Sequence, residues 1–286
     1  MRKFWIAAGA LFAAGIACLI CVFPVKAVML RAFPDGGLYL LQTDSYLAVP
    51  ASEKKFLFEM TVFEVKKGDY TPLVNYEEIA LVDRQGREWP AASVNLVPQF
   101  ADFSLNRTSV GISVALPEDG EEELIAFDRV RFIRSEDSLT LPLGSLNVEI
   151  VADERISTQA ATYEQTESSA EFSLYRVSLY NLSKESELFL RGVRLTLAEA
   201  TYEQSMEIGS LGQSGRPEAL SLPAMHQGIL TVNFSSERKF CHNIIRPLIA
   251  FEIEGEERCA VASNYARYVS SMDRSDILAY LNGEKR

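Results

Sequence analysis

The feature that most constrains this chain is a run of twenty uncharged, mostly apolar residues near its N-terminus, residues 4–23. An α-helix rises about 1.5 Å per residue, so roughly twenty such residues can cross a hydrocarbon core about 30 Å thick. We therefore expect residues 4–23 to contact membrane lipid as a single-pass transmembrane helix. The larger part of the chain must then fold outside the bilayer.

Basic residues flank this run on both sides, Arg2 and Lys3 before it and Lys26 and Arg31 after it, so the charge difference that sets orientation is small. No second long apolar run follows. The short basic tail is therefore expected to stay in the cytoplasm while the rest is exported, as with an ordinary signal sequence. This predicts a single-pass cell-membrane protein with extracytoplasmic C-terminal domains, as in a bacterial cell envelope.

The processing of this leader has three alternatives. A retained signal anchor is favoured because a cleaved signal usually has only about 7–15 apolar residues. Cleavage after Ala27 is the second alternative, since Val25 and Ala27 place small side chains where a signal peptidase inspects them. Lipidation at Cys18 is disfavoured, because apolar residues follow it where a polar tether is expected. The sequence leaves open whether the leader is retained, cleaved or lipidated.

The exported part is strongly acidic. The chain has 28 Lys and Arg residues against 39 Asp and Glu residues, and residues 1–31 contain four of the basic residues and none of the acidic ones. The remainder therefore carries 24 basic and 39 acidic side chains, a formal charge of −15. Such a surface repels a phosphate backbone, so we expect no nucleic-acid partner. It also favours a body that projects from the membrane over one that lies along anionic lipid.

Apolar residues that alternate with a period of two predict strands in the first half of the exported part. Residues 56–65 are apolar on nearly both faces and indicate a central strand. Residues 78–83, a glycine-containing turn and residues 87–89 have the pattern of a hairpin. Further strands are expected at residues 110–116, 124–133 and 146–151. About seven strands separated by turns are typical of a β-sandwich.

The second half has the same character. Strands are expected at residues 172–180, 188–197, 228–234, 248–253 and 258–262. The glycines and serines of residues 209–217 indicate a surface loop. Near the end of the chain, capping residues from Asp273 and a glycine at Gly283 bracket a short helix, which we expect to pack on the second sandwich.

One hairpin carries a resemblance to a known group of domains. Residues 79–89, Ile-Ala-Leu-Val-Asp-Arg-Gln-Gly-Arg-Glu-Trp, resemble a hairpin of small immunoglobulin-like domains that follow N-terminal anchors in Gram-positive bacteria. The likeness covers residues 38–152 and departs from the group at residues 66–70, where an Asn-Thr-Gly turn is usual. It implies an immunoglobulin-like architecture for a secreted or tethered protein, and it assigns no activity.

The predicted fold class is therefore all-β, with an N-terminal transmembrane helix, two immunoglobulin-like β-sandwich domains and a short C-terminal helix. The predicted boundaries are residues 1–31 for the anchor, 36–152 for the first sandwich, 153–272 for the second and 273–286 for the helix and tail. We place the boundary between the sandwiches in residues 152–170, a polar stretch without strong periodicity.

Cysteine and histidine are sparse. Beyond the expected anchor only Cys241 and Cys259 remain, and they suit either one disulfide in an oxidising compartment or two buried thiols. With only His226 and His242 beside them, we predict no metal site, no cofactor and no thiol catalysis. No nucleophile elbow, phosphate-binding loop or dinucleotide-binding glycine motif is present, so no catalytic residue is assigned and the protein is expected not to be an enzyme.

Aromatic side chains of the second half are the candidates for a binding platform, because their faces bind sugars and anchor interfaces: Tyr163, Tyr175, Tyr180, Tyr202 and Tyr265. The favoured function is a membrane-anchored, extracytoplasmic protein that binds a protein or cell-envelope partner, as an accessory to a membrane assembly. Two alternatives stay open, a cell-envelope hydrolase with a carboxylate pair and a structural spacer without a ligand. Carboxyl groups about 5–9 Å apart in a deep cleft favour the hydrolase, and flat sheet faces favour the binder.

Overall fold

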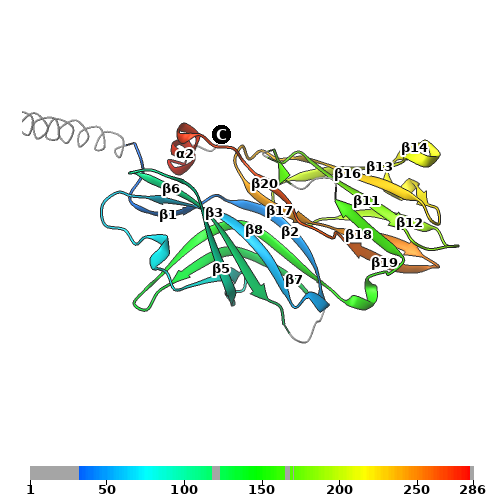
Figure 1. Cartoon of the computed structure of the whole chain (residues 1–286), viewed down its shortest axis with the longest axis horizontal. Helices are drawn as coiled ribbons and strands as arrows, with labels where there is room; N and C mark the ends of the chain where they lie inside the picture. Colours follow the sequence, from blue (N-terminus) through cyan, green and yellow to red (C-terminus); the bar gives the residue numbers. More distant parts are fainter. Residues whose placement is uncertain (1–31, 118–122, 165–167, 170, 284–286) are drawn as a thin grey trace, which may run out of the picture.

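The computed structural model describes residues 32–117, 123–164, 168–169 and 171–283. In these residues the protein is built mainly from β-strands, with a short C-terminal α-helix, α2, at Arg274–Leu281 (Figure 1). The transmembrane helix expected at residues 4–23 lies outside the described residues. None of the helices that are described is long and apolar enough to cross a bilayer.

The first half contains the strands predicted from its periodicity, of which β5, β6 and β8 extend well beyond the predicted ranges, and two strands that were not predicted, β1 and β2. The strands are β1 (Gly37–Leu40), β2 (Thr43–Pro50), β3 (Lys55–Val65), β4 (Glu78–Asp83), β5 (Glu88–Ala101), β6 (Leu105–Ala115), β7 (Glu123–Ile133) and β8 (Ser138–Val151). Short 3-10 turns lie at Ala51–Glu53, Leu73–Asn75 and Asp153–Arg155.

The second half contains shorter strands. They are β9 (Ala160–Glu164), β10 (Ser168–Ser169), β11 (Leu174–Asn181), β12 (Leu188–Arg194), β13 (Thr201–Ile208), β14 (Gln213–Gly215), β15 (Ser221–Leu222), β16 (Gln227–Ser235), β17 (His242–Arg246), β18 (Leu248–Ile253), β19 (Glu256–Val261) and β20 (Ala266–Val269). Short 3-10 turns lie at Gly209–Leu211 and Pro217–Ala219. The glycine-rich segment predicted as a loop is exposed and includes the short strand β14.

The first core lies between two layers that share β5. The first layer has the order β1-β3-β6-β5, and residues 88–90 of β5 then pair with β4, from which the ladder continues through β7, β8 and β2. Phe56, Phe58 and Met60, on one face of β3 as predicted, are buried in this core. Phe56 meets Phe127 of β7 with ring centroids 6.0 Å apart. This packing of two layers is that of a β-sandwich.

The second core is enclosed by a five-stranded sheet, β14-β13-β16-β11-β9, and a four-stranded sheet, β15-β12-β18-β19. The alternation predicted for β11 is confirmed, because Tyr175, Val177 and Leu179 are fully buried in this core. Arg176, between them in sequence, is exposed on the outer face of the sheet.

The two cores share one wall. β2 pairs in parallel with β8 on one side and with β17 on the other, so the first ladder continues through β17 and β20 to β10 (Figure 1). Alternate residues of β2 enter different cores, Leu47 and Val49 the first and Tyr46 and Ala48 the second. A single sheet therefore crosses the position where the sequence suggested a boundary. The predicted domain boundaries themselves stay a prediction.

A glycine permits the close approach of β8 to β2. Gly144 has a φ of +100°, and a Cβ atom built on it lies 2.3 Å from the carbonyl oxygen of Thr43. Any side chain here therefore meets both backbone strain and a backbone clash. The parallel pairing of β2 with β8 begins at these two residues.

A buried carboxylate fixes the second half against β2. Asp44 Oδ1 accepts the backbone N–H of Ala198 at 2.7 Å, and Oδ2 accepts those of Glu199 and Ala200, both at 2.9 Å. Asp44 is buried, and these three donors replace the water that its charge loses. The segment after β12 is thereby held at a defined position on the shared sheet.

The predicted C-terminal helix is confirmed, with Asp273 as its N-cap. The Asp273 carboxylate accepts the backbone N–H of Asp276, and the Asp276 side chain accepts the backbone N–H of Asp273 in return. This reciprocal capping box satisfies backbone donors that the first turn leaves without partners.

The expected packing of α2 on the second sandwich is wrong, because α2 covers the outer face of β1 and β3 in the first half. Ile277 of α2 joins Phe63 of β3 in a third apolar cluster. The Tyr280 hydroxyl donates to the carbonyl oxygen of Leu40 at 2.7 Å and accepts the backbone N–H of Gln42 at 3.0 Å. The helix buries the apolar end of β3 that faces away from the first core.

Candidate functional site

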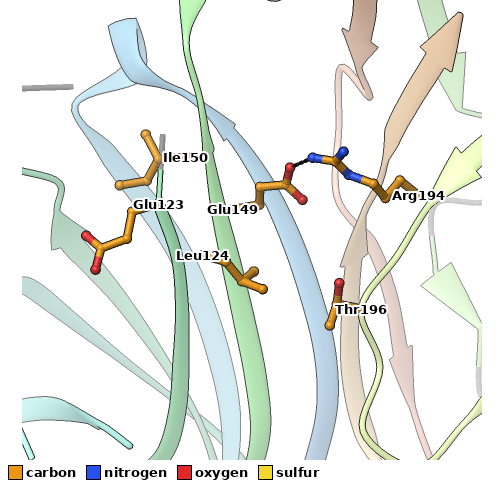
Figure 2. Close-up of a pocket in the computed structure, with 6 residues that line it drawn as sticks. All are labelled: Glu123, Leu124, Glu149, Ile150, Arg194 and Thr196. Atoms are coloured by element: carbon orange, nitrogen blue, oxygen red, sulfur yellow. Dashed lines mark hydrogen bonds and ion pairs between the residues drawn. The ribbon is translucent and has the colours of Figure 1, made fainter. Parts of the chain in front are cut away.

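A shallow hollow of about 300 Å³ lies on β7 and β8, near the end of β12 (Figure 2). Its lining residues are Glu123, Leu124, Glu149, Ile150, Arg194 and Thr196. Figure 2 shows the carboxylate of Glu149 pointing toward Arg194 and that of Glu123 pointing away from Glu149. Because the hollow contains the carboxylates of Glu123 and Glu149, it is the candidate position for the carboxylate pair of a hydrolase.

Both oxygens of Glu149 are engaged. Oε1 pairs with the guanidinium of Arg194, and Oε2 accepts the hydroxyl hydrogen of Tyr46. Burial raises the pKa of Tyr46 above its ordinary value, with Arg194 opposing the rise, so this phenol stays protonated and donates. Glu149 thus joins β8 to β12 and to the second core.

Glu123 is engaged in another direction. Its Oε1 pairs with the guanidinium of Arg87 at 2.9 Å, and Arg87 also pairs with Asp83 at 2.7 Å. The two carboxylates of the hollow are therefore neutralised by different arginines. Glycoside hydrolysis requires two carboxyl groups that face one substrate, whereas these two point apart.

A second cluster, buried between β3 and β17, has the residue types of a catalytic relay. Thr61 Oγ1 lies 2.8 Å from His242 Nδ1, and His242 Nε2 lies 3.8 Å from Glu59 Oε1. Glu59 in turn accepts hydrogen bonds from Ser109 at 2.5 Å and from Arg267 at 2.7 Å. The His242 side chain is fully buried, so no substrate reaches it.

Burial shifts the pKa of His242. Burial lowers this pKa from 6.5 to about 4, with Arg267 and Arg107 acting in the same direction and Glu59 opposing them. The ring is therefore neutral near pH 7, where its burial costs least. The cluster fastens β3 of the first half to β17 and β20 of the second. The sequence could not identify it, because its members lie about 180 positions apart.

No disulfide joins Cys241 and Cys259 in the structure, and both cysteines are buried. Cys259 donates through Sγ to the carbonyl oxygen of Arg155 at 3.4 Å, whereas Cys241 accepts from Ser270 Oγ at 3.9 Å. Burial raises the pKa of the Cys241 thiol, so it is not an activated nucleophile. Their pairing in an oxidising compartment stays a prediction.

The structure brings two of the five candidate tyrosines to one open surface. Tyr175 is fully buried, and Tyr202 and Tyr265 are half-buried around the cores. Tyr163, 58% exposed, and Tyr180 lie on neighbouring strands of the five-stranded sheet, because Tyr163 pairs with the residue two positions before Tyr180. The five tyrosines therefore do not form the single platform that the sequence suggested.

We call the surface around Tyr163 and Tyr180 the distal face. It is the outward side of the five-stranded sheet, and its members are Tyr163, Arg176, Tyr180, Glu207, Gln227 and Ile229. Strands β13 and β14 of this sheet lie at the opposite end of the molecule from β1 and α2 (Figure 1). The face mixes aromatic, aliphatic and charged groups.

The other end of the molecule, which we call the proximal end, gathers the first described residues, α2 and the turn after β5. The side chain of Asn282 donates to the carbonyl oxygen of Ala32 at 3.0 Å. The guanidinium of Arg274 lies 5.3 Å from the ring centroid of Phe33 and 5.9 Å from that of Phe103. Arg274 thus bridges the start of the described chain and the β5–β6 turn.

No family model matches this chain, and no curated protein matches it either. Similar solved structures include a protein of unknown function from Porphyromonas gingivalis W83, with 9% identity over 79% of this chain and 98% of that one and a TM-score of 0.24. Another is the C-terminal domain of the Streptococcus agalactiae AgI/II polypeptide BspA, with 6% identity over 82% of this chain and 99% of that one and a TM-score of 0.23. A chicken TCR has 8% identity over 82% of this chain and 100% of that one, with a TM-score of 0.22. Likenesses this weak carry no argument about fold or function, so the immunoglobulin-like resemblance of residues 38–152 stays a prediction.

Proposed function

We propose that this chain is a membrane-tethered, extracytoplasmic and non-enzymatic protein that holds its distal face away from the bilayer to bind a protein partner of the cell envelope. The observation that carries the proposal is the shared wall formed by β2 and β17. It joins the two cores into one body, with the first described residues at one end and the distal face at the other (Figure 1). Because the body is continuous, the position of the tether determines where the distal face lies relative to the membrane.

The engaged carboxylates of the hollow support a binding role over hydrolysis. Glu149 is held by Arg194 and Tyr46, and Glu123 by Arg87. An inverting or retaining glycosidase needs two carboxyl groups that face one substrate, and these two point apart. On architecture, we further propose that each core is an immunoglobulin-like sandwich, for which the support is its facing and mainly antiparallel sheets.

The experiment is photo-crosslinking of the full-length chain in native membranes. A photoreactive amino acid replaces Tyr163 on the distal face, and in a matched variant it replaces Phe189, which is 52% exposed on β12 in the opposite sheet. The proposal expects a discrete crosslinked product at position 163 and none at position 189. Absence of a product at both positions contradicts the binding role and favours the spacer.

Added protease tests the localisation in the same material. The proposal expects intact cells to leave the folded body open to cleavage, because it lies outside the cytoplasmic membrane. Protection of the body in intact cells, with cleavage only after lysis, contradicts the extracytoplasmic assignment.

A further inference from the structure

We propose that the proximal end lies directly against the bilayer, with Phe100 and Phe103 inserted at the level of the lipid head groups. This rests on the proposed function, because it requires that residues 4–23 span the membrane. It adds a second and independent contact between the body and lipid, which fixes the direction in which the distal face projects.

The length of the connecting segment limits how far the body can stand from the membrane. Eight residues, 24–31, separate the apolar run from Ala32, where the described chain begins. Fully extended, they span less than about 30 Å, since each residue adds at most about 3.6 Å. Ala32 is fixed to the proximal end by its hydrogen bond with Asn282. This end is therefore the part of the body that a spanning helix brings nearest to lipid.

Two exposed rings lie at this end, with an exposed valine close by. Phe100 and Phe103, at the end of β5 and in the turn that follows, are 45% and 43% exposed, and Val97, six residues before Phe103 on β5, is 49% exposed. Single exposed apolar residues are ordinary on a protein surface, whereas a group of them indicates an interaction site. Phe side chains occur on surfaces that bury into the head-group boundary, and the short connection to residues 4–23 makes lipid the occupant for which we argue.

The turn presents Phe103 in a fixed position. The Asp102 carboxylate accepts the backbone N–H groups of Ser104 at 2.6 Å and Leu105 at 2.8 Å, and it pairs with Arg274 of α2. Arg274 also lies over the ring of Phe103. Because the turn is already ordered, little conformational entropy is lost when the ring enters lipid.

The proximal end carries little net charge. Its segments, residues 32–37, 66–70, 100–107 and 272–283, contain four basic and five acidic residues, a formal charge of −1 in 31 residues, whereas the other 224 residues after residue 31 carry −14. A nearly neutral end meets anionic head groups without the repulsion that the remaining surface experiences. The acidic remainder thus favours an end-on orientation of the body over one lying flat on the bilayer.

The test uses the full-length chain in phosphatidylcholine vesicles, with Trp5 and Trp89 replaced by Phe so that a single introduced indole fluoresces. Phe103→Trp places that indole at the proximal end, and the matched variant Phe189→Trp places it at an exposed Phe of the second half. With acyl-brominated lipid, we expect a roughly twofold loss of emission for F103W and none for F189W, because only an indole at the interface lies within reach of bromine. If F103W does not fold by circular dichroism, Phe100→Trp gives the same reading from the neighbouring ring.

Vesicle flotation separates this inference from the proposed function. A chain that floats with the vesicles while F103W and F100W are quenched no more than F189W keeps its tether and overturns the proximal contact. A chain that does not float overturns the proposed membrane tether. A chain that floats with selective quenching of F103W supports both.

Discussion

Buried polar side chains join the two halves of this protein at particular atoms. Arg246 of β17 donates to both carboxylate oxygens of Glu53, at 2.8 and 2.6 Å, and stacks on Tyr265 with its guanidinium carbon 5.0 Å from the ring centroid. Asp44 of β2 accepts a hydrogen bond from Ala198, and His242 of β17 shares one with Thr61 of β3, so both strands of the shared sheet are held to neighbouring segments. A buried charge is tolerated only with such partners, so removal of one partner is more damaging than loss of the pair.

Acid is expected to weaken the protein through His242. Its pKa is about 4 in the folded chain and 6.5 in the unfolded one, so between these pH values the unfolded chain binds more protons. The free energy of unfolding therefore falls as the pH falls from about 6.5 to about 4, by about 3 kcal/mol in full. Glu59 adds to the loss below pH 4.5. Burial raises its pKa, but the hydrogen bond from Ser109, the charge of protonated His242 and the contact with Arg267 together lower it.

The variant His242→Asn tests this linkage, because asparagine retains a polar partner for Thr61 and does not titrate. Urea unfolding between pH 4 and 7 is expected to show a shallower pH dependence for H242N than for the parent chain. An unchanged slope contradicts the role assigned to His242.

Asp44→Ala is expected to destabilise the protein by about 2–4 kcal/mol, because three N–H groups lose their acceptor and that of Ala200 is buried. Hydrogen exchange at residues 198–200 should accelerate in the same variant. The control is Asp128→Ala, since the Asp128 side chain is 39% exposed and pairs with its neighbour Arg129, and it should cost no more than about 0.5 kcal/mol. Equal losses in the two variants contradict the account.

At the scale of single elements, the Tyr280 hydroxyl group contributes two of the contacts that hold α2 on the first half. Tyr280→Phe removes both the hydrogen bond to Leu40 and the acceptor for Gln42, and we expect a loss of roughly 1–3 kcal/mol with faster hydrogen exchange throughout α2. Tyr39→Phe is the matched control, because the Tyr39 hydroxyl donates to the carbonyl oxygen of Asp35 at an exposed site. A Y280F variant as stable as Y39F shows that α2 docks without this contact.

Strands with one clear apolar face, such as β3 and β11, could be predicted from the sequence because period-two alternation reports burial on that face directly. β2 and β17 could not, since both of their faces are buried and their polar residues find partners on distant strands. The sequence predicts only the first residues of β5, because Pro90 and Pro98 interrupt the strand pattern and most side chains of β5 are exposed. The distal face could not be predicted either, because the register between neighbouring strands determines which tyrosines lie on the same face of a sheet.

At the scale of the whole molecule, the shared wall turns two sandwiches into one body (Figure 1). Independent domains on a linker bind partners in many orientations, whereas a fused body presents its distal face in one. Periodicity could not reveal this, because the parallel pairing of β2 with β17 joins residues about 200 positions apart. The proposed tether and the proximal contact determine the direction in which the distal face points only if the two cores are rigidly joined.

Calorimetric unfolding of the full-length chain in detergent tests that claim most directly. Phe127→Ala opens a cavity in the first core and Phe251→Ala one in the second, each at a cost of about 3–5 kcal/mol. We expect one cooperative transition that both variants move to lower temperature, because neither core is closed without the shared sheet. Two separate transitions, with F127A moving only one and F251A only the other, contradict the account.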